Sequence, residues 1–209
     1  MTYRIGLISD IHASPAPLKE ALSIFRKHDV DIILCPGDVA GYGNELDETV
    51  QLLIESQCKT VLGNHEIWYM EKNRSEESPV YQYLQSLPRT LELDIENKRI
   101  LMVHAHPPDS YSGGIRLLDQ DGNLDPVLLS QWSEKLANIE YDVVIVGHTH
   151  QVYAETLGTT LLVNPGSTTY NHSCAILTLP DLTVDFYRLS NKQILKSWNW
   201  GTNQVSQQS

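Results

Sequence analysis

The pentapeptide Val146-Gly147-His148-Thr149-His150 follows an apolar run from Tyr141 to Val146 that only one charged residue interrupts. An apolar run of this length, stopped by a glycine, predicts a buried strand. Because glycine has no Cβ to clash, we expect Gly147 to permit a sharp turn on which the two histidines converge. Neutral histidine is a common metal ligand, so the pair predicts a metal site. Two exposed loop histidines are the simpler alternative.

Four more predicted strands along the chain end in the same way, in polar residues beside a glycine or a proline. These strands are expected at 3–9, 31–35, 60–62 and 99–103, and the residues that follow them are Asp10 and His12, Asp38, Asn64 and His65, and His104. Ligands of open α/β sheets bind beyond the carboxyl ends of the strands. Five strand ends of this kind predict one shared site.

The order of the predicted elements indicates an α/β protein. Helices are expected at 18–25, 46–54, 68–87 and 126–137, and Pro15 and Pro17 are expected in the turn before the first helix. Strand, helix, strand, helix, strand over the first 62 residues implies a parallel sheet with crossover helices. A hairpin is expected at 91–103, a loop at 106–122, and strands at 152–156, 160–163, 173–179 and 183–189. We expect one domain over 1–209, with a frayed tail at 201–209.

Composition excludes several classes of protein. The 209 residues are 41% hydrophobic, which is enough for one sizeable core. The formal net charge of −11 makes nucleic acid an unfavourable partner, since nucleic-acid binding needs basic patches. The three cysteines form no Cys-x-x-Cys pair, as in a reduced cytoplasmic protein. Without an apolar stretch of eighteen residues or a signal peptide, we expect a cytoplasmic protein that does not enter a membrane.

Five sequence blocks together resemble the calcineurin-like metallophosphoesterases. The blocks are Asp10-x-His12, Gly37-Asp38-x-x-Gly41, Gly63-Asn64-His65-Glu66, His104-x-His106 and Gly147-His148-Thr149-His150. Gly41-Tyr42-Gly43 and Asn164-Pro165-Gly166-Ser167 resemble the small bacterial and archaeal phosphodiesterase branch. One departure is Ala105, where the family usually has glycine. The resemblance implies a four-layer αββα fold, in which helices flank both outer faces of a two-sheet β-sandwich.

The resemblance also implies two metal sites and a catalytic histidine. Asp10, His12, Asp38 and His150 would hold one metal, and Asp38, Asn64, His104 and His148 the other. Asp38 would bridge the two metals, and His65 would act beside Asn64 as the catalytic histidine that binds no metal. Two divalent metals, two carboxylates and a bridging hydroxide leave a charge of roughly +1, which attracts a phosphate. This mixed ligand set favours manganese, with iron, zinc or nickel as alternatives, over calcium.

Four further residues have both a functional and a plain structural interpretation. His106 could contact a phosphate or lie in solvent, and Arg116 could clamp a phosphate or lie on the surface. Tyr42 could form a wall for the leaving group, although packing is the commoner role of a tyrosine. Glu66 could orient His65, but a charge that suits the helix dipole is the favoured interpretation.

The function that this sequence predicts is hydrolysis of a phosphodiester or nucleotide-type substrate by in-line attack of a metal-bridging hydroxide. The expected partner is therefore a small phosphorylated molecule, and the sequence carries no signal for an oligomeric state. One alternative is a scaffold protein on the same fold, which would be expected to lose His65. A phosphomonoesterase or protein phosphatase is the other, although no arginine adjoins any of the five blocks.

Overall fold

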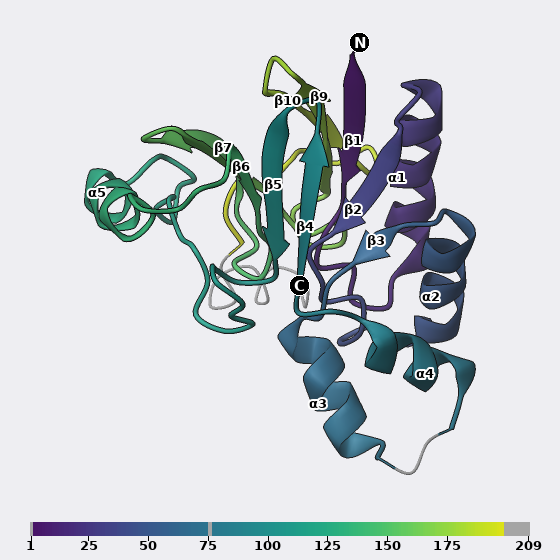
Figure 1. Ribbon diagram of the computed structural model, residues 1–209. Helices are drawn as coiled ribbons and strands as arrows, with labels where there is room; N and C mark the ends of the chain where they lie inside the picture. Colours follow the sequence, from purple (N-terminus) through teal and green to yellow (C-terminus); the bar gives the residue numbers. More distant parts are fainter. Residues whose placement is uncertain (1, 75–76, 199–209) are drawn as a thin grey trace.

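The computed structural model describes residues 2–74 and 77–198, which form two five-stranded sheets with helices on their outer faces (Figure 1). The first sheet has the strand order β10-β9-β1-β2-β3. Its strands are β1 (Tyr3–Leu7), β2 (Ile32–Cys35), β3 (Lys59–Thr60), β9 (Ser173–Leu179) and β10 (Thr183–Arg188). β1, β2 and β3 are parallel, as predicted, and are joined by α1 (Pro15–Lys27) and α2 (Leu46–Glu55).

The second sheet has the strand order β4-β5-β6-β8-β7. Its strands are β4 (Thr90–Ile95), β5 (Lys98–Val103), β6 (Val143–Ile145), β7 (Val152–Leu157) and β8 (Thr160–Pro165). The three central strands β5, β6 and β8 are parallel, and an antiparallel strand closes each edge. α5 (Pro126–Lys135) lies over this sheet, on the side of the molecule away from α1 and α2 (Figure 1).

Alternating side chains on the strands build three apolar layers. Ile5, Leu7, Leu34, Ile100, Met102, Val143, Ile145, Ala175 and Leu177 point between the two sheets. Their neighbours Cys35, Cys174 and Ile176 pack with α1 and α2, and Leu101, Val103 and Val144 pack with residues of α5. Because each sheet is covered on both faces, its central strands are apolar at successive positions rather than alternating with polar residues. The four-layer αββα fold is confirmed.

Two predictions of helix position were wrong. The expected helix at 68–87 is two helices, α3 (Asn64–Lys72) and α4 (Pro79–Ser86), and the Ser78 side chain caps the second by accepting from Tyr81 N–H. Pro15 is the first residue of α1 rather than part of a preceding turn, a position where a proline N–H is not needed.

The hairpin between β4 and β5 is confirmed, and its turn has two residues. Glu96 and Asn97 form it with positive φ angles of 50° and 59°, as two-residue hairpin turns require. The tail at 201–209 lies outside the described residues. In the described ranges, no helix has the length and apolar character to span a membrane.

Candidate metal centre

The carboxyl ends of five parallel strands meet at one edge of the sandwich. Asp10 follows β1, Asp38 follows β2 and Asn64 follows β3 in the first sheet, while His104 and His148 follow β5 and β6 in the second. The two sheets meet directly here, because His148 N–H donates to both carboxylate oxygens of Asp10, at 3.1 and 3.2 Å. The predicted juxtaposition of these strand ends is therefore present.

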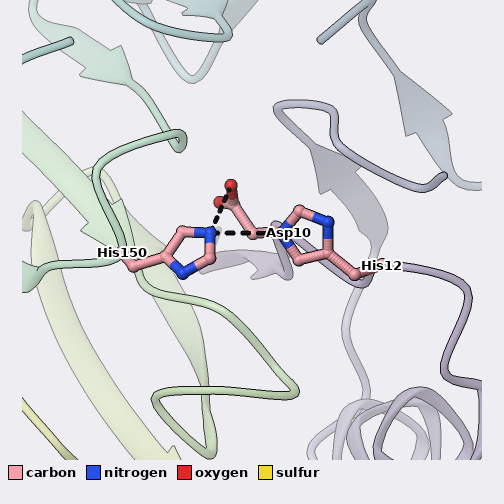
Figure 2. Close-up of side chains that lie close together, drawn as sticks. All are labelled: Asp10, His12 and His150. Atoms are coloured by element: carbon pink, nitrogen blue, oxygen red, sulfur yellow. Dashed lines mark hydrogen bonds and ion pairs between the residues drawn. The ribbon is translucent and has the colours of Figure 1, made fainter. Parts of the chain in front are cut away.

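Three groups of side chains at this edge have the geometry of metal sites, each with its candidate ligand atoms within 4.8 Å of one another. One group is Asp10, His12 and His150, a second is Asp38, His104 and His148, and a third is His12, Asp38 and His65. Figure 2 shows the first group, in which the His12 and His150 rings meet beside the Asp10 carboxylate. Asp38 belongs to the second and the third group. Its carboxylate therefore lies between His104 and His148 on one side and His12 and His65 on the other.

Asn64 completes the second group. Its side-chain oxygen lies 3.0 Å from His104 Nε2 and 2.8 Å from His148 Nδ1. The structure thus brings all seven residues predicted as metal ligands to one buried edge of the protein. It also brings His65 within reach of a metal, in the group with His12 and Asp38, whereas the sequence interpretation placed it outside both ligand sets.

The histidine rings are oriented by backbone carbonyls. His12 Nδ1 lies 3.1 Å from the Ala40 carbonyl, and His104 Nδ1 lies 2.6 Å from the Pro36 carbonyl. A carbonyl oxygen only accepts, so each Nδ1 carries a proton and each Nε2 faces the site. His12 Nε2 lies 3.1 Å from His150 Nε2. Ring nitrogens that converge in this way, beside buried carboxylates, form a donor set that fits a cation such as manganese, iron or zinc.

The charges at the site are unevenly distributed among the histidines. Burial lowers the pKa of His12 and of His148 to about 4, so both rings are neutral at pH 7. Burial also disfavours a charge on His104, but the Asp38 carboxylate, together with Asp10 and the Pro36 carbonyl, outweighs burial and raises the pKa of His104 to about 9. Burial raises the pKa of Asp10, yet the neighbouring histidines, His150 foremost, lower it below its ordinary value. Both carboxylates are therefore ionised at neutral pH.

The backbone at the candidate ligands is unusual. Five of them have positive φ angles, namely Asp10 (49°), His12 (52°), Asp38 (54°), His148 (65°) and His150 (49°). Non-glycine residues in this region are strained, and such strain concentrates at functional sites. The sharp turn expected at Gly147 is instead made by the histidines themselves. Gly147 is needed for space, since a Cβ there would overlap Ser9 Oγ and lie 2.8 Å from Asp10 Oδ2.

Glu66 has a larger role than sequence reasoning assigned to it. It lies at the third position of α3, and its carboxylate accepts the Gly63 N–H at 2.8 Å, so the helix-opening role is present. The same carboxylate accepts the N–H groups of Asp38 at 3.0 Å and Ala40 at 2.8 Å. A fully buried carboxylate therefore fixes the loop that carries Asp38. The sequence signal for this role was the position of Glu66 three residues after Gly63, where a glutamate can accept the backbone N–H of the residue that begins a helix.

A second support is the segment Asn164–Asn171, which runs from the last two residues of β8 toward β9. Asn164 Nδ2 donates to the Gly147 carbonyl at 2.9 Å, and Ser167 Oγ donates to the Asp10 carbonyl at 2.6 Å. Asn171 Nδ2 donates to the His150 carbonyl at 2.9 Å. All three side chains are buried, and together they fix both ligand loops of the first group. Residues 164–167 were noted in the sequence because they resemble the small phosphodiesterase branch. Nothing in the sequence indicated the hydrogen bonds that this segment makes.

The three residues predicted to contact substrate lie in different places. The Tyr42 ring centroid is 4.8 Å from that of His12 and 4.7 Å from that of His65. His106 is outside the three groups, with Nδ1 2.7 Å from the Pro107 carbonyl and its ring 5.8 Å from Trp132. Arg116 is exposed and lines a cavity of about 300 Å³ with Gln151 and Trp198, and none of the candidate metal ligands lines that cavity. Only Tyr42 therefore lies against the candidate metal ligands.

Sequence reasoning missed two aromatic residues at the site. The Tyr170 ring stacks on that of His150, with centroids 5.4 Å apart and planes at 19°. The Trp198 ring packs against Tyr170 with centroids 5.0 Å apart, and the backbone N–H of Trp198 donates to the His150 carbonyl at 3.0 Å. Neither residue adjoins a sequence block with ligand chemistry, so only the fold could place them here.

Known proteins of similar sequence include two curated relatives. An uncharacterized protein of Methanocaldococcus jannaschii is 25% identical, over 78% of this chain and 68% of its own length. Serine/threonine-protein phosphatase 2 of Salmonella typhimurium is 26% identical, over 78% of this chain and 87% of its own length.

The solved structures that resemble the fold include two phosphoesterases. A metallophosphoesterase from Sphaerobacter thermophilus superposes with a TM-score of 0.66 and 22% identity, covering 90% of this chain and 89% of its own. A structure described as a novel archaeal phosphodiesterase superposes with a TM-score of 0.59 and 18% identity, covering 89% and 99%. At these identities the similarity concerns the fold.

The family match extends over most of the chain. The family model described as the calcineurin-like phosphoesterase superfamily domain matches residues 3–181, a range that contains the three side-chain groups and their supports. The chain therefore belongs to the calcineurin-like phosphoesterase superfamily and is a metal-dependent phosphoester hydrolase.

Proposed function

We propose that the protein is a dinuclear phosphodiesterase that acts on a small phosphodiester or nucleotide-type substrate. The observation that carries this proposal is the position of the Asp38 carboxylate, which is shared between a group that contains His12 and a group that contains His104 and His148. Asp10, His12, Asp38 and His150 would hold one cation, and Asp38, Asn64, His104 and His148 the other. Two such cations supply an activated water and charge stabilisation for an in-line displacement.

His65 is the residue proposed to act on the substrate. Its backbone N–H donates to Asp38 Oδ1 at 3.0 Å, which ties the start of α3 to the carboxylate shared by the two groups. Burial lowers the pKa of His65, despite the opposing effect of Asp38, so the ring is neutral at pH 7. A neutral ring can donate its N–H to a phosphoryl oxygen or to the leaving oxygen. The lack of a Cβ at Gly41 leaves the space that His65 Nδ1 occupies.

Manganese and a cytoplasmic location are parts of the same proposal. Manganese suits a donor set of carboxylates, imidazoles and one amide. Cys35, Cys58 and Cys174 are free thiols in the structure, as expected of a protein that works in a reducing compartment.

The test is hydrolysis of bis(4-nitrophenyl) phosphate by protein purified without chelator and supplied with manganese. We expect activity in the wild type and a loss of roughly 100-fold or more in His65→Ala and in Asn64→Ala, with the circular dichroism spectrum unchanged. His28→Ala is the control, because His28 is an exposed histidine beside Tyr187 at the end of α1. Absence of hydrolysis of any phosphoester by the manganese-loaded wild type would contradict the proposal.

A phosphomonoesterase or protein phosphatase is the second candidate, supported by the similarity to serine/threonine-protein phosphatase 2. Against it, Arg116, the arginine that sequence reasoning offered as a phosphate clamp, is exposed and lines a cavity that contains none of the candidate metal ligands. The two candidates are distinguished by comparing kcat/KM for the aryl diester with that for 4-nitrophenyl phosphate and for a phosphoserine peptide. A higher value for either monoester would favour the second candidate.

A further inference from the structure

Two large aromatic side chains flank His65 and remain exposed. The Tyr42 ring centroid lies 4.7 Å and the Trp68 ring centroid 4.8 Å from that of His65. Tyr42 is 59% exposed and Trp68 is 56% exposed. Among the described residues, the exposed large apolar side chains are Tyr42, Ile54, Trp68, Leu124 and Val127. Tyr42 and Trp68 are the aromatic residues in this set, and both lie beside His65.

The local structure fixes both rings where they are. Trp68 follows His65 by three residues on α3, so the two side chains lie on the same face of the helix. In the sequence, Tyr42 lies between Gly41 and Gly43. A Cβ on Gly43 would lie 2.5 Å from the carbonyl oxygens of His12 and Ala13. The loop that presents Tyr42 therefore lies directly on the backbone of a candidate ligand.

The aromatic surface continues past Tyr42 toward the first group of ligands. The Tyr170 ring is 5.9 Å from Tyr42 and stacks on His150. Rings thus extend from Trp68 through His65 and Tyr42 to Tyr170, alongside Asp10, His12 and His150. A group attached to an ester oxygen that contacts His65 would lie against Tyr42 and Trp68.

We propose that Tyr42 and Trp68 bind a planar aromatic group, such as a nucleobase or an aryl ring, attached to the phosphoester that this site cleaves. The proposal rests on the proposed function, since it makes these two residues determinants of substrate specificity. Planar rings stack on exposed aromatic side chains with useful energy and with little dependence on ring identity. It also assigns recognition of the substrate to α3 and the Tyr42 loop.

A second site lined by aromatic residues is an alternative place for the planar group to bind. A cavity of about 580 Å³ between α5 and the second sheet is lined by Trp132, Tyr141 and His106, among others. It also holds Glu92, Lys135 and Pro107, and it lies outside the three side-chain groups. A planar ring bound there would leave Tyr42 and Trp68 without a role, so the test includes Trp132.

The test compares AMP with ribose 5-phosphate, which share a phosphate and a ribose and differ by the base. Both are titrated calorimetrically into the full-length, manganese-loaded protein, with phosphate release monitored in parallel so that binding alone is measured. We expect wild type to bind AMP roughly 5- to 150-fold more tightly than ribose 5-phosphate, as stacking on aromatic side chains provides. We expect the double variant Tyr42→Leu/Trp68→Leu to lose this difference by weakening AMP binding, with ribose 5-phosphate binding unchanged within about twofold.

Two further variants complete the design. Trp68→Phe keeps an aromatic ring and should retain most of the preference for AMP, whereas Trp132→Leu should retain all of it. Equal binding of the two ligands by wild type, a preference that persists in the double variant, or a preference abolished by Trp132→Leu would each overturn the inference. A base-dependent difference that disappears in the double variant supports the inference even if no phosphoester is hydrolysed, in which case the proposed function alone fails.

Discussion

Glu66 is the residue on which the geometry of the Asp38 loop depends. Its carboxylate accepts three buried backbone N–H groups, from Gly63, Asp38 and Ala40. Each buried donor left without a partner costs about 1–3 kcal/mol, so Glu66→Ala, which leaves three, should lower the free energy of unfolding by roughly 3–9 kcal/mol. The variant should also bind manganese more weakly, because the Asp38 N–H would lose its bond to Glu66 and, among the described residues, only the carbonyl of Asp38, which accepts the His12 N–H at 3.0 Å, would still hold this backbone. Urea denaturation and a manganese titration measure both effects.

Glu71 on the same helix provides the control, because it is exposed. Glu71→Ala should change the free energy of unfolding by less than about 0.5 kcal/mol, as exposed substitutions usually do. Equal losses in the two variants would mean that the three bonds to Glu66 contribute no more than a surface charge does.

His104 determines how metal binding depends on pH. Because the Asp38 carboxylate, working against burial, raises the pKa of His104 to about 9, the ring is protonated in the metal-free protein at pH 7. A bound cation needs the Nε2 lone pair, so binding must release this proton. Manganese affinity should therefore rise by up to about tenfold per pH unit between pH 7 and pH 9, and then level off. His12 and His148, with pKa values of about 4, are already neutral over this range.

Calorimetry in two buffers of different ionisation enthalpy at pH 7 counts the released protons. We expect close to one proton at pH 7 and none above pH 10. Dissociation constants that stay the same from pH 7 to pH 9 would show that the metal does not displace a proton from His104.

The sequence was sufficient to find the candidate ligands but not what holds them. Asp10, Asp38 and His148 stand directly after predicted strands, so their chemistry and position are both visible in the chain. The bonds from Glu66 to Asp38 and Ala40 cross 28 and 26 residues, and no local pattern encodes such separations. The positive φ angles of the histidines were equally hidden, because side-chain identity predicts a left-handed backbone reliably only for glycine.

At the scale of elements, the segment Asn164–Asn171 is the main support of the ligand loops. Asn164 Nδ2 donates to the Gly147 carbonyl and to Thr149 Oγ1, and its side-chain oxygen accepts the Gly166 N–H. Asn164→Ala removes these bonds inside the core and should cost roughly 2–4 kcal/mol of unfolding free energy. Because Gly147 and Thr149 adjoin His148 and His150, manganese affinity should fall as well.

Asn123→Ala is the matched control, since Asn123 is an exposed asparagine whose side chain bonds Asp119 at the protein surface. It should alter the free energy of unfolding by less than about 0.5 kcal/mol and leave manganese binding intact. If Asn164→Ala weakened stability but left manganese binding as in wild type, the segment would support the core without positioning the ligand loops.

Elements were predictable to the extent that their apolar pattern was continuous. β9 was predicted at its observed bounds, because its residues 174–177 are a continuous apolar run, buried between the helices α1 and α2 on one face and the second sheet on the other. The two helices α3 and α4 were merged, because the polar residues at 68–87 lack the periodicity that marks a boundary. The beginning of α3 at Asn64 matters most, since it puts Asn64 and His65 on the first turn of a helix rather than in a loop.

At the scale of the whole molecule, alternation of strands and helices indicated one parallel sheet, whereas the second sheet came from the resemblance to a family. The pairing of β1 with β9 joins residues that lie about 170 positions apart, and no local signal specifies it. The consequence for function is that two of the three candidate metal groups combine both sheets, whereas the group of His12, Asp38 and His65 comes from the first sheet alone. Asp10 and His12 follow β1 while His150 follows β6, and Asp38 follows β2 while His104 follows β5.

A cation bound at either group would therefore join the two halves of the sandwich, and its removal should lower the stability of the whole protein. A ligand at 100 times its dissociation constant stabilises the folded state by about 2.7 kcal/mol. For a chain of 209 residues, that corresponds to a rise of roughly 5–11 °C in the unfolding temperature. Manganese should produce this rise in scanning calorimetry, and a chelator should reverse it.

His150→Ala separates a specific site from general effects of the metal. This variant should lose a large part of the manganese-dependent rise, because it removes a ligand of the first group. His28→Ala, which removes an exposed histidine, should keep the full rise. An unfolding temperature that is the same with manganese and with chelator would mean that the two sheets are joined by packing and hydrogen bonds alone. The metal-centred interpretation of Asp10, Asp38 and the histidines would then be wrong.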